Sequence, residues 1–448
     1  MSKEINRREF LRTAGIASAG LVIGGMGLSS KSYARILGAN ERVNLCFMGL
    51  GSRGGRGAQQ ARTFVGAPNI HISYLADVDS ENIAECMKRL SSMIPYKPIE
   101  LVDFRKALDD KELDGVIISA PDHWHAPAAI MCAQAKKHVF LEKPVSHSPR
   151  EGELLIEAAK KYNVLIETGT QRRSFPFLQR VMKMIHDGEI GKVFMGKAWY
   201  TNNRKETYLK PGTVPANLNY ELWQGPAPRR PYMEGLIHYD WHWFWHWGTG
   251  EALNNGTHEL DLLVWGAQAG FPTKVSSMGG RYVYNDHWET PDTQLITWET
   301  PNAVFSWEGR SRNNTNVEGE GRGVIFYGDK GSIETGNLFY KMYDLSGKLI
   351  REESVADPLE PGQKAPSPNA RYDILHDTNF VEAIRGKEKL NCPVNIGHQT
   401  NIWVQLGNIA QRTGRMLQCN PANGHILNDP EAMRLWSREY EKGWEPKL

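Results

Sequence analysis

Short apolar runs alternate with helix-length segments in the first part of the chain. The runs typical of buried strands are residues 43–48, 70–76, 114–119, 138–141 and 164–168. The segments long enough for helices are about 53–64, a stretch that follows His125 and runs to about Lys136, and about 149–162, and another helix begins at Asp79-Ser80. Strands and helices that alternate in this order form a parallel sheet with helices on both faces. The pattern predicts a doubly wound α/β domain over residues 40–168.

Strands follow one another more closely after Gly169. Apolar runs with strand character lie at about 192–200, 273–284, 292–299, 302–309, 322–328 and 331–335. Helical segments at about 371–386 and 398–413 are expected to close the core. These elements predict a second α/β domain over residues 169–415, followed by a C-terminal tail over 416–448.

Composition limits the class of protein. The chain has 448 residues, of which 40% are hydrophobic and 23% charged, enough for two or three globular domains. Lys and Arg total 53 against 51 Asp and Glu, so the chain lacks the basic excess of a nucleic-acid-binding protein. The five cysteines show no CxxC spacing, and neither a cysteine metal site nor a disulfide framework is expected.

The N-terminus has the layout of an export signal. Arg7-Arg8 precedes an apolar, Gly- and Ala-rich stretch from about Thr13 to Leu28, and Ser32 and Ala34 supply the small residues of a cleavage site. The alternative is a retained anchor, but the stretch is short and glycine-rich for a span of about 20 apolar residues. Residues 1–34 are therefore expected to be a twin-arginine signal peptide. The mature chain is expected to be periplasmic or otherwise exported, and not membrane-spanning.

A glycine-rich turn joins the first strand to the first helix, with the GxGxxG sequence Gly49-Leu50-Gly51-Ser52-Arg53-Gly54. The first glycine allows a tight turn, the second lets the backbone approach a pyrophosphate, and the third lets the helix pack on the strand. The N–H groups that open the helix, at Ser52 and Arg53, would face the phosphates. Because the motif follows a strand and opens a helix, it predicts a Rossmann dinucleotide-binding domain.

Asp77 ends the second strand, where an acidic side chain binds the adenosine ribose hydroxyls of a dinucleotide. A carboxylate there would repel a 2′-phosphate, so NAD is favoured over NADP as the cofactor. Asp77 lies 28 residues beyond Gly49, at the long end of the usual spacing, and Asp79 is a rival for the same role. The alternative for Asp77 is an N-cap of the next helix.

Further candidate residues follow the other strands of this domain. Pro121-Asp122-His123-Trp124-His125 closes the strand at 114–119, and Glu142-Lys143-Pro144 closes the strand at 138–141. Gln171 and Arg172 follow the last strand and are expected to face the cleft. In a doubly wound sheet the site lies beyond the carboxyl ends of the strands, so these segments are expected to converge with the glycine turn and Asp77.

The order and spacing of these motifs, with a later Asn254-Asn255-Gly256-Thr257-His258, resemble the Gfo/Idh/MocA oxidoreductase family, relatives of glucose–fructose oxidoreductase and inositol dehydrogenase. The resemblance covers about residues 40–415. It implies a C-terminal α/β domain with a large, mostly antiparallel open sheet whose outer face pairs subunits into a homo-oligomer. It also implies a tightly held nicotinamide cofactor and a carbohydrate or polyol substrate.

The resemblance also implies roles for individual residues. Lys143 would lie by the nicotinamide and the reacting carbon, and the Lys143–Pro144 bond is often cis in the family. The cofactor side would include Pro121, His123, His125, Glu142 and Gln171, with one of the two histidines only capping the following helix.

The catalytic candidates implied in this way are Lys143, His258 and Asn254. The family often has an Asp where this chain has Asn254, and an amide can orient an imidazole but cannot stabilise its cation as a carboxylate does. The main acid–base role is left open between Lys143 and His258. The alternatives are a surface salt bridge for Lys143 and a structural role for His258.

An aromatic segment, Tyr239 to Trp247, follows a proline-rich loop at 202–240 that is a candidate lid or partner arm. His238, His242 and His246 recur at four-residue spacing, but the segment alternates like an aromatic-packed loop, and no metal is expected. The candidate substrate residues are Lys143, Arg172, Trp243, Trp245 and His258. The alternative for the two tryptophans is packing of the domain or of a subunit contact.

Three functions fit these observations. The first is an exported oxidoreductase that transfers a hydride between a tightly bound nicotinamide cofactor and a carbohydrate or polyol hydroxyl, a reaction that needs a base such as His or a desolvated Lys. The alternative is an NAD-dependent glycoside hydrolase that acts through transient sugar oxidation, elimination, hydration and re-reduction. The third is a non-catalytic sugar- or nicotinamide-binding protein, against which the presence of both Lys143 and His258 argues.

Overall fold

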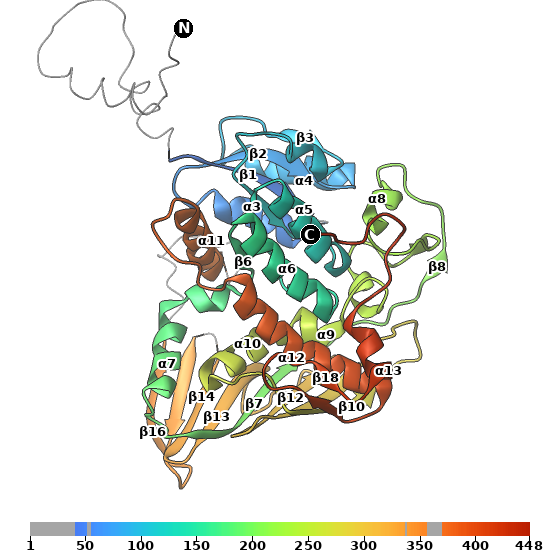
Figure 1. The fold of residues 1–448 in the computed structure, drawn as a ribbon. Helices are drawn as coiled ribbons and strands as arrows, with labels where there is room; N and C mark the ends of the chain where they lie inside the picture. The colour runs from blue at the N-terminus through green and yellow to red at the C-terminus, as the bar shows by residue number, and fades with distance from the viewer. Residues whose placement is uncertain (1–40, 52–54, 337, 356–369) are drawn as a thin grey trace, which may run out of the picture. The chain divides into compact units, whose positions relative to one another are not determined.

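Two large β-sheets with helices between them form most of the fold in the part of the chain that the computed structural model describes, residues 41–51, 55–336, 338–355 and 370–448 (Figure 1), and a third sheet has two short strands. The predicted signal peptide at 1–34 lies outside these residues, as do Ser52, Arg53 and Gly54 of the glycine motif.

The first sheet is parallel and has six strands in the order β3-β2-β1-β4-β5-β6. Its strands are β1 (Val43–Met48), β2 (Ile70–Ala76), β3 (Ile99–Leu101), β4 (Gly115–Ile118), β5 (His138–Leu141) and β6 (Ile166–Thr168). The helices between them are α3 (Arg56–Phe64), α4 (Ser80–Leu90), α5 (Asp122–Gln134) and α6 (Pro149–Tyr162), with the 3-10 helix η1 (Phe104–Ala107). The strand order reverses between β1 and β4, which is where such sheets bind ligands. The predicted doubly wound Rossmann domain is confirmed.

Local signals in the sequence fix the ends of these helices. Asp79 is the N-cap of α4, and its side chain accepts a hydrogen bond from Glu81 N. Ser148 and Glu151 form a capping box at the start of α6, and Asn163 ends that helix in the left-handed conformation. The N-cap of α4 is therefore Asp79, which leaves Asp77 free of that role.

The second sheet has ten strands in the order β16-β15-β14-β13-β7-β12-β11-β10-β17-β18. They are β7 (Val193–Thr201), β10 (Lys274–Gly280), β11 (Thr293–Glu299), β12 (Val304–Arg310), β13 (Arg322–Gly328), β14 (Gly331–Thr335), β15 (Phe339–Tyr343), β16 (Leu349–Ser354), β17 (Leu417–Cys419) and β18 (Ile426–Leu427). Neighbouring strands are antiparallel except β7 and β12, which are parallel. The large, mostly antiparallel sheet that the resemblance implied is confirmed.

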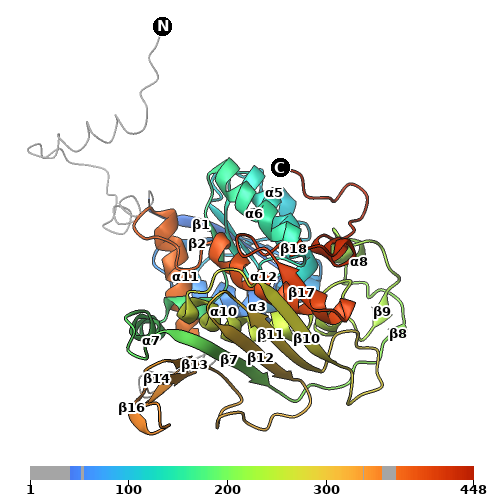
Figure 2. The ribbon, with the colours of Figure 1, turned by 60° about the horizontal axis from the view of Figure 1, so that its bottom comes forward.

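A layer of helices separates the two sheets (Figure 1). It includes α7 (Pro176–His186), α9 (Gly250–Asn254), α10 (Gly256–Ala267) and α12 (Val394–Thr413), after the 3-10 helix η2 (Gln171–Ser174). Helix α10 packs on β7 and β13, and α12 packs on β10 and on α6 of the first domain. Trp298, Trp307 and Trp403 fill the core between this layer and the sheet. Figure 2 shows β7, β12, β11 and β10 side by side beneath these helices.

Two segments pack differently from the expectation. Helix α11 (Ala370–Ile384), expected to close the second core, covers α3, and its Phe380 contacts the rings of Phe64 and Phe140. Residues 416–448, expected to form a tail, include β17, β18, α13 (Pro430–Met433) and the 3-10 helix η4 (Arg434–Trp436), and Trp444 packs on Trp124 at 5.2 Å. An apolar pattern identifies a face to be buried but not the element that buries it.

Among the described residues, no helix combines the length and the apolar character that a membrane span needs.

Candidate active site

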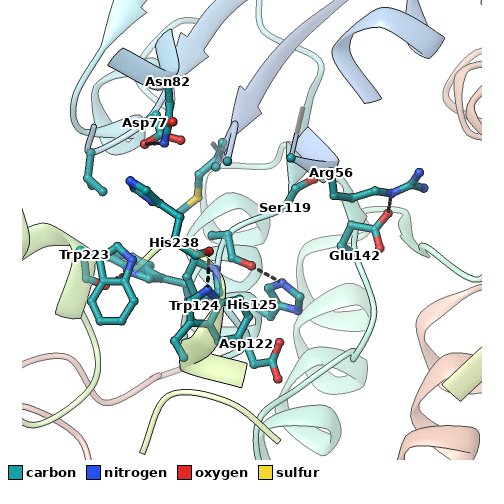
Figure 3. A pocket seen from close by; sticks show the side chains of 18 of the residues that line it. Arg56, Asp77, Asn82, Ser119, Asp122, Trp124, His125, Glu142, Trp223 and His238 are labelled. Atoms are coloured by element: carbon teal, nitrogen blue, oxygen red, sulfur yellow. Dashed lines mark hydrogen bonds and ion pairs between the residues drawn. The ribbon is translucent and has the colours of Figure 1, made fainter. Parts of the chain in front are cut away.

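A cavity of about 490 Å³ lies at the carboxyl ends of β1, β2, β4 and β5 (Figure 3). This volume is within the range of small-molecule sites, about 300–1,000 Å³. The structure brings together on its wall many of the residues predicted from the sequence: Gly49, Gly51, Asp77, Pro121, His125, Glu142, Lys143, Gln171, Asn254 and His258. The last two come from α9 and α10, so the cavity lies between the Rossmann domain and the second domain.

The glycine turn leaves bare backbone on the cavity wall. Gly49 and Gly51 have φ angles of 81° and 64°, a region that only glycine adopts without strain. A Cβ at Gly49 would lie 2.6 Å from Ala120 N, and one at Gly51 would lie 3.0 Å from Gly55 Cα. Because Gly49 and Gly51 place no side chain on the cavity wall, the described part of this turn fits the pyrophosphate of a dinucleotide.

Gly57 is a functional residue that the motif analysis missed. A Cβ on this residue of α3 would lie 1.8 Å from Gly49 O, so its hydrogen alone allows the helix to pack against the turn. The GxGxxG spacing assigned this role to Gly54. The signal that could have found Gly57 is the continued glycine pattern, Gly54-Gly55-Arg56-Gly57.

We predict that Gly57→Ala lowers the free energy of unfolding by about 1–3 kcal/mol, because overpacking against backbone cannot be relieved by side-chain rotation. Affinity for NAD falls as well, since the turn must move. Thermal unfolding with and without NAD measures both effects. Gly270→Ala is the control, because the nearest atom that a Cβ there would meet among the described residues is Pro421 O, at 3.9 Å. Equal melting temperatures for the two variants would contradict the packing role of Gly57.

Asp77 and Asp79 have separate roles at the end of β2. Asp77 Oδ2 accepts from Leu50 N at 2.6 Å, and its Oδ1 accepts from Asp79 N and from Asn82 Nδ2. Burial raises the pKa of Asp77, and these hydrogen bonds oppose the rise. Asp79 instead caps α4 and accepts from His238 Nε2 at 2.8 Å. Figure 3 shows Asp77, Asn82 and His238 at one end of the cavity. Asp77 therefore fits the ribose position.

The Glu142-Lys143-Pro144 turn is held from several sides. Glu142 accepts from Arg56 Nε at 2.6 Å and from Gln60 Nε2 at 2.9 Å. Burial alone would raise the pKa of Glu142, but the charges of Arg56 and Lys143 outweigh it and hold the pKa below its usual value. The Lys143–Pro144 bond is cis, as the resemblance implied, and His125 Nδ1 lies 2.6 Å from Pro144 O. His125 Nε2 lies 2.7 Å from Ala120 O, so its ring links the segment after β4 to this turn.

Lys143 is the charged group that faces the second domain across the cavity. Its Nζ donates to the backbone oxygen of Asn254 at 2.5 Å and to Asn254 Oδ1 at 3.3 Å. Burial lowers the pKa of Lys143, and the charges of Glu142 and Asp122 oppose the change. A lowered pKa makes a lysine a better proton acceptor than an exposed lysine, which is what a general base requires.

His258 and Asn254 are not paired in the way that the resemblance to the family implied. Asn254 uses its oxygen atoms for Lys143, and no hydrogen bond joins it to His258 in the described part of the chain. Three buried atoms on the cavity wall lack partners among the described residues: Asn254 Nδ2, His258 Nδ1 and Gln171 Oε1. Burial, with the charges of Arg172 and Lys143, lowers the pKa of His258 well below its usual value. Unpaired buried polar atoms mark where a bound molecule would complete the hydrogen bonding.

His123 and Arg172 do not line the cavity. The fully buried His123 ring lies between the carbonyl oxygens of Trp223 and Trp247, and burial lowers its pKa to about 3. Arg172 forms a buried ion pair with Glu259 at 2.7 Å. Arg172 was expected to face the cleft because it follows a strand end, and His123 was a candidate for the cofactor side with capping of the next helix as its alternative, but both side chains turn into protein instead.

Trp243 and Trp245 also lie off the cavity wall. The Trp243 ring packs against Trp288 at 4.4 Å, and Trp245 lies beside Arg412. The 3-10 helix η3 (Asp240–Trp243) is the reason, because its turn changes which side chains face the cleft. The aromatic side chains on the cavity wall are instead those of Tyr239, Trp241, Trp223, Trp124 and Phe104.

The loop at 202–240, the candidate lid or partner arm, contains β8 (Lys210–Pro211), α8 (Tyr220–Gln224) and β9 (Met233–Glu234). We call residues 217–242 the roof segment, since six of them line the cavity: Leu222, Trp223, His238, Tyr239, Trp241 and His242. The segment is bonded to the Rossmann domain. Asn219 N donates to Val78 O at 2.8 Å, and Asn217 Nδ2 donates to Asp79 Oδ1 at 2.8 Å. The unusual length of this loop indicated that it has a role, but the sequence alone did not indicate which part of the protein the loop covers.

The three histidines at four-residue spacing have separate partners. His238 binds Asp79, His242 binds Tyr239 O, and His246 binds Pro228 O. The described residues contain no group of three or more His, Cys, Asp or Glu side chains that could hold a metal ion.

Known proteins resemble this chain in both domains. The protein-family model described as "Oxidoreductase family, NAD-binding Rossmann fold" matches residues 43–170. A second family model, described as "Oxidoreductase family, C-terminal alpha/beta domain", matches residues 189–334. The uncharacterized oxidoreductase YrbE of Bacillus subtilis is 30% identical over 359 residues, which cover 78% of this chain and 88% of YrbE. A glycosyl hydrolase family 109 protein of Shewanella pealeana is 26% identical over 216 residues, 44% of this chain and 46% of that protein.

Solved structures share the fold at lower identity. Levoglucosan dehydrogenase in complex with NADH and levoglucosan has a TM-score of 0.64 and 18% identity, over 84% of this chain and 99% of that one. The WlbA dehydrogenase from Bordetella pertussis, in complex with NADH and UDP-GlcNAcA, has a TM-score of 0.62 and 16% identity, over 85% and 99% of the two chains. With the match to YrbE over most of both chains, these findings show that the chain belongs to the Gfo/Idh/MocA oxidoreductase family, with its NAD-binding Rossmann domain and C-terminal α/β domain.

Proposed function

We propose that this protein is an exported oxidoreductase that transfers a hydride between a tightly bound NAD(H) and a carbohydrate or polyol hydroxyl. The observation that carries the proposal is one cavity that holds Lys143, His258 and the bare glycine turn together. The ligands of levoglucosan dehydrogenase and WlbA, NADH with a sugar in each case, support the substrate class.

The chain's own residues provide the proton chemistry. Bound nicotinamide would supply the hydride acceptor or donor. Lys143 Nζ is held by Asn254 O on the cavity wall, where it can take the hydroxyl proton during oxidation and return it during reduction, and burial lowers its pKa in the direction that favours this role. His258, kept neutral by burial and by the charges of Arg172 and Lys143, can hydrogen-bond the same hydroxyl.

One feature supports NAD rather than NADP as the cofactor, and another supports tight binding of the cofactor. The Asp77 carboxylate at the end of β2 would repel a 2′-phosphate. The roof segment contributes Leu222 and Trp223 to the cavity and is bonded to β2–α4 residues Val78 and Asp79, so it would have to open before a dinucleotide could leave. Slow exchange of the cofactor is the expected consequence.

The test uses the purified mature protein. We expect NAD(H) to be released on denaturation, in nearly one equivalent per chain, and the bound cofactor to change its redox state when a reactive sugar or polyol is added. Absorbance of NADH follows both. A protein purified without NAD(H) that also fails to bind it would contradict the proposed function.

NAD-dependent glycoside cleavage is the second candidate, favoured by the number of proton-transfer groups at the cavity. Besides Lys143 and His258, the wall carries Tyr239, whose hydroxyl accepts from Arg204 Nη1 at 2.8 Å. Elimination and hydration need an acid and a base beyond those of alcohol oxidation. The glycosyl hydrolase family 109 relative also supports this candidate. Release of the aglycone from aryl glycosides without added oxidant would favour cleavage, and accumulation of a keto-sugar would favour net oxidation.

Export by the twin-arginine route is part of the proposal and rests on the sequence of residues 1–34. Replacing Arg7 and Arg8 by lysine is expected to leave the full-length precursor inside the cell. Cell fractionation and the mass of the chain measure this. Export of the double variant at the wild-type level would contradict the twin-arginine assignment.

We also infer that the outer face of the ten-stranded sheet pairs two copies of the chain. This face carries the exposed apolar side chains of Met195, Met278, Leu295 and Val304 on adjacent strands. Leu295→Glu is expected to shift the particle mass measured by light scattering toward the monomer, since a charge in an apolar interface is costly. Leu345→Glu, at an exposed site between β15 and β16, is the control. An unchanged mass for Leu295→Glu would contradict this interface.

A further inference from the structure

His242 lies on the cavity wall with a fixed ring orientation. Its ring stacks on that of Trp241, with centroids 3.7 Å apart and an angle of 19° between the planes. Trp241 is itself anchored, because its Nε1 donates to His238 O at 3.1 Å and its backbone N donates to Leu236 O at 2.9 Å. The protein therefore sets the direction of the His242 ring before any ligand binds.

One ring nitrogen of His242 already has a partner. Nδ1 lies 2.6 Å from the carbonyl oxygen of Tyr239. A carbonyl oxygen can only accept, so Nδ1 carries the hydrogen, and in the neutral ring Nε2 is then a lone-pair acceptor. No donor from the described residues meets Nε2, which is left for the cavity.

The surroundings of His242 favour the neutral ring. Burial, together with the positive charges of Lys143 and Arg204, lowers its pKa to about 3, although the bond to Tyr239 opposes the change. A neutral acceptor binds an O–H or N–H group. It repels the lone pairs of a carboxylate or a carbonyl oxygen at the same position.

We propose that His242 Nε2 binds a second hydroxyl group of the substrate while Lys143 holds the hydroxyl that reacts. This inference rests on the proposed function and deepens it. The expected substrates are then compounds with at least two hydroxyl groups. The part of the substrate that meets His242 carries no charge. A 2-hydroxy acid that presents its carboxylate there is not a substrate.

The tautomer is tested in the NAD-loaded protein with nitrogen-15-labelled histidine. The His242 signals are identified by their loss in His242→Gln. We expect the hydrogen on Nδ1 at neutral pH and a shift of the Nε2 signal when polyols are added, with myo-inositol, levoglucosan, glucose and N-acetylgalactosamine as the probes. A hydrogen on Nε2, or an Nε2 signal that none of these compounds moves, would overturn the proposal.

Two substitutions of unequal length separate hydroxyl binding from support of the pocket. Gln places an amide oxygen near the position of Nε2, whereas Asn is too short to reach it. For the tightest of the four probes, we expect the dissociation constant to rise about tenfold in His242→Asn and clearly less in His242→Gln. Both variants keep bound NAD(H). Equal affinity in the two variants, or loss of NAD(H) from either, would mean that the ring only supports the pocket and would overturn the proposal.

The matched control is His246→Gln. His246 belongs to the same aromatic segment but lies off the cavity wall, with its Nε2 2.8 Å from Pro228 O. Its substitution is expected to leave polyol affinity unchanged, and a loss as large as that of His242→Asn would overturn the assignment to His242. Absence of NAD(H) from the wild-type protein would count against the proposed function instead, so the two failures are distinguishable.

Discussion

Replacement of Lys143 by methionine is expected to lower turnover by about 10²–10⁴-fold while bound NAD(H) remains in place. Methionine keeps much of the length of the side chain but has no proton to exchange and no charge. The substitution also removes the hydrogen bonds from Nζ to Asn254. Glu142 keeps its ion pair with Arg56, so the turn retains its anchor to α3. Single-turnover reduction of the bound cofactor by a reactive sugar measures the effect.

The control for Lys143→Met is Lys137→Met. Lys137 is also buried, but its Nζ donates to the backbone oxygens of Asp110 and Leu113, away from the cavity. That variant is expected to lose stability but to keep its turnover per folded molecule. If Lys143→Met kept full turnover, the acid–base role would have to move to another group on the wall.

Much of the Rossmann half could be predicted from the sequence because its signals are local. A strand, a glycine turn and a helix follow one another within about 20 residues, and Asp77 is placed by the strand that precedes it. The rule that sites lie beyond the carboxyl ends of parallel strands then brought Pro121, Glu142 and Lys143 together without a structure. Site residues that lie at the ends of strands can therefore be predicted from the sequence.

The part of the site that lies outside the Rossmann domain was harder to predict from the sequence, because it depends on tertiary packing. The roof segment reaches the Rossmann domain through contacts such as Asn219 N to Val78 O, which no periodicity encodes. In the aromatic segment, a short 3-10 turn decides that Trp241 and His242 face the cavity while Trp243 faces Trp288. A run of alternating aromatic residues does not reveal such a turn.

Asn254 shows how a small departure from the family pattern changes the electrostatics of the site. A carboxylate at this position would lie close to Lys143, because Asn254 Oδ1 is 3.3 Å from Lys143 Nζ. The amide instead accepts a hydrogen bond without adding charge, and burial is left to lower the pKa of Lys143. Asn254 also places no negative charge near His258, and the pKa of His258 is lowered as well. Both groups are thereby kept closer to their neutral forms.

Asn254→Asp is therefore expected to move the pH dependence of sugar oxidation to higher pH. An opposite charge at this distance raises the pKa of Lys143 by about 1–3 units. Oxidation needs the unprotonated amine, so the acidic limb of kcat/KM shifts upward by the same amount, and at a fixed pH below that limb the rate falls about tenfold per unit. Asn254→Ala, which removes the amide without adding charge, is the control and is expected to lack the upward shift. An acidic limb at the wild-type position in Asn254→Asp would mean that Lys143 is not the group whose titration limits the reaction.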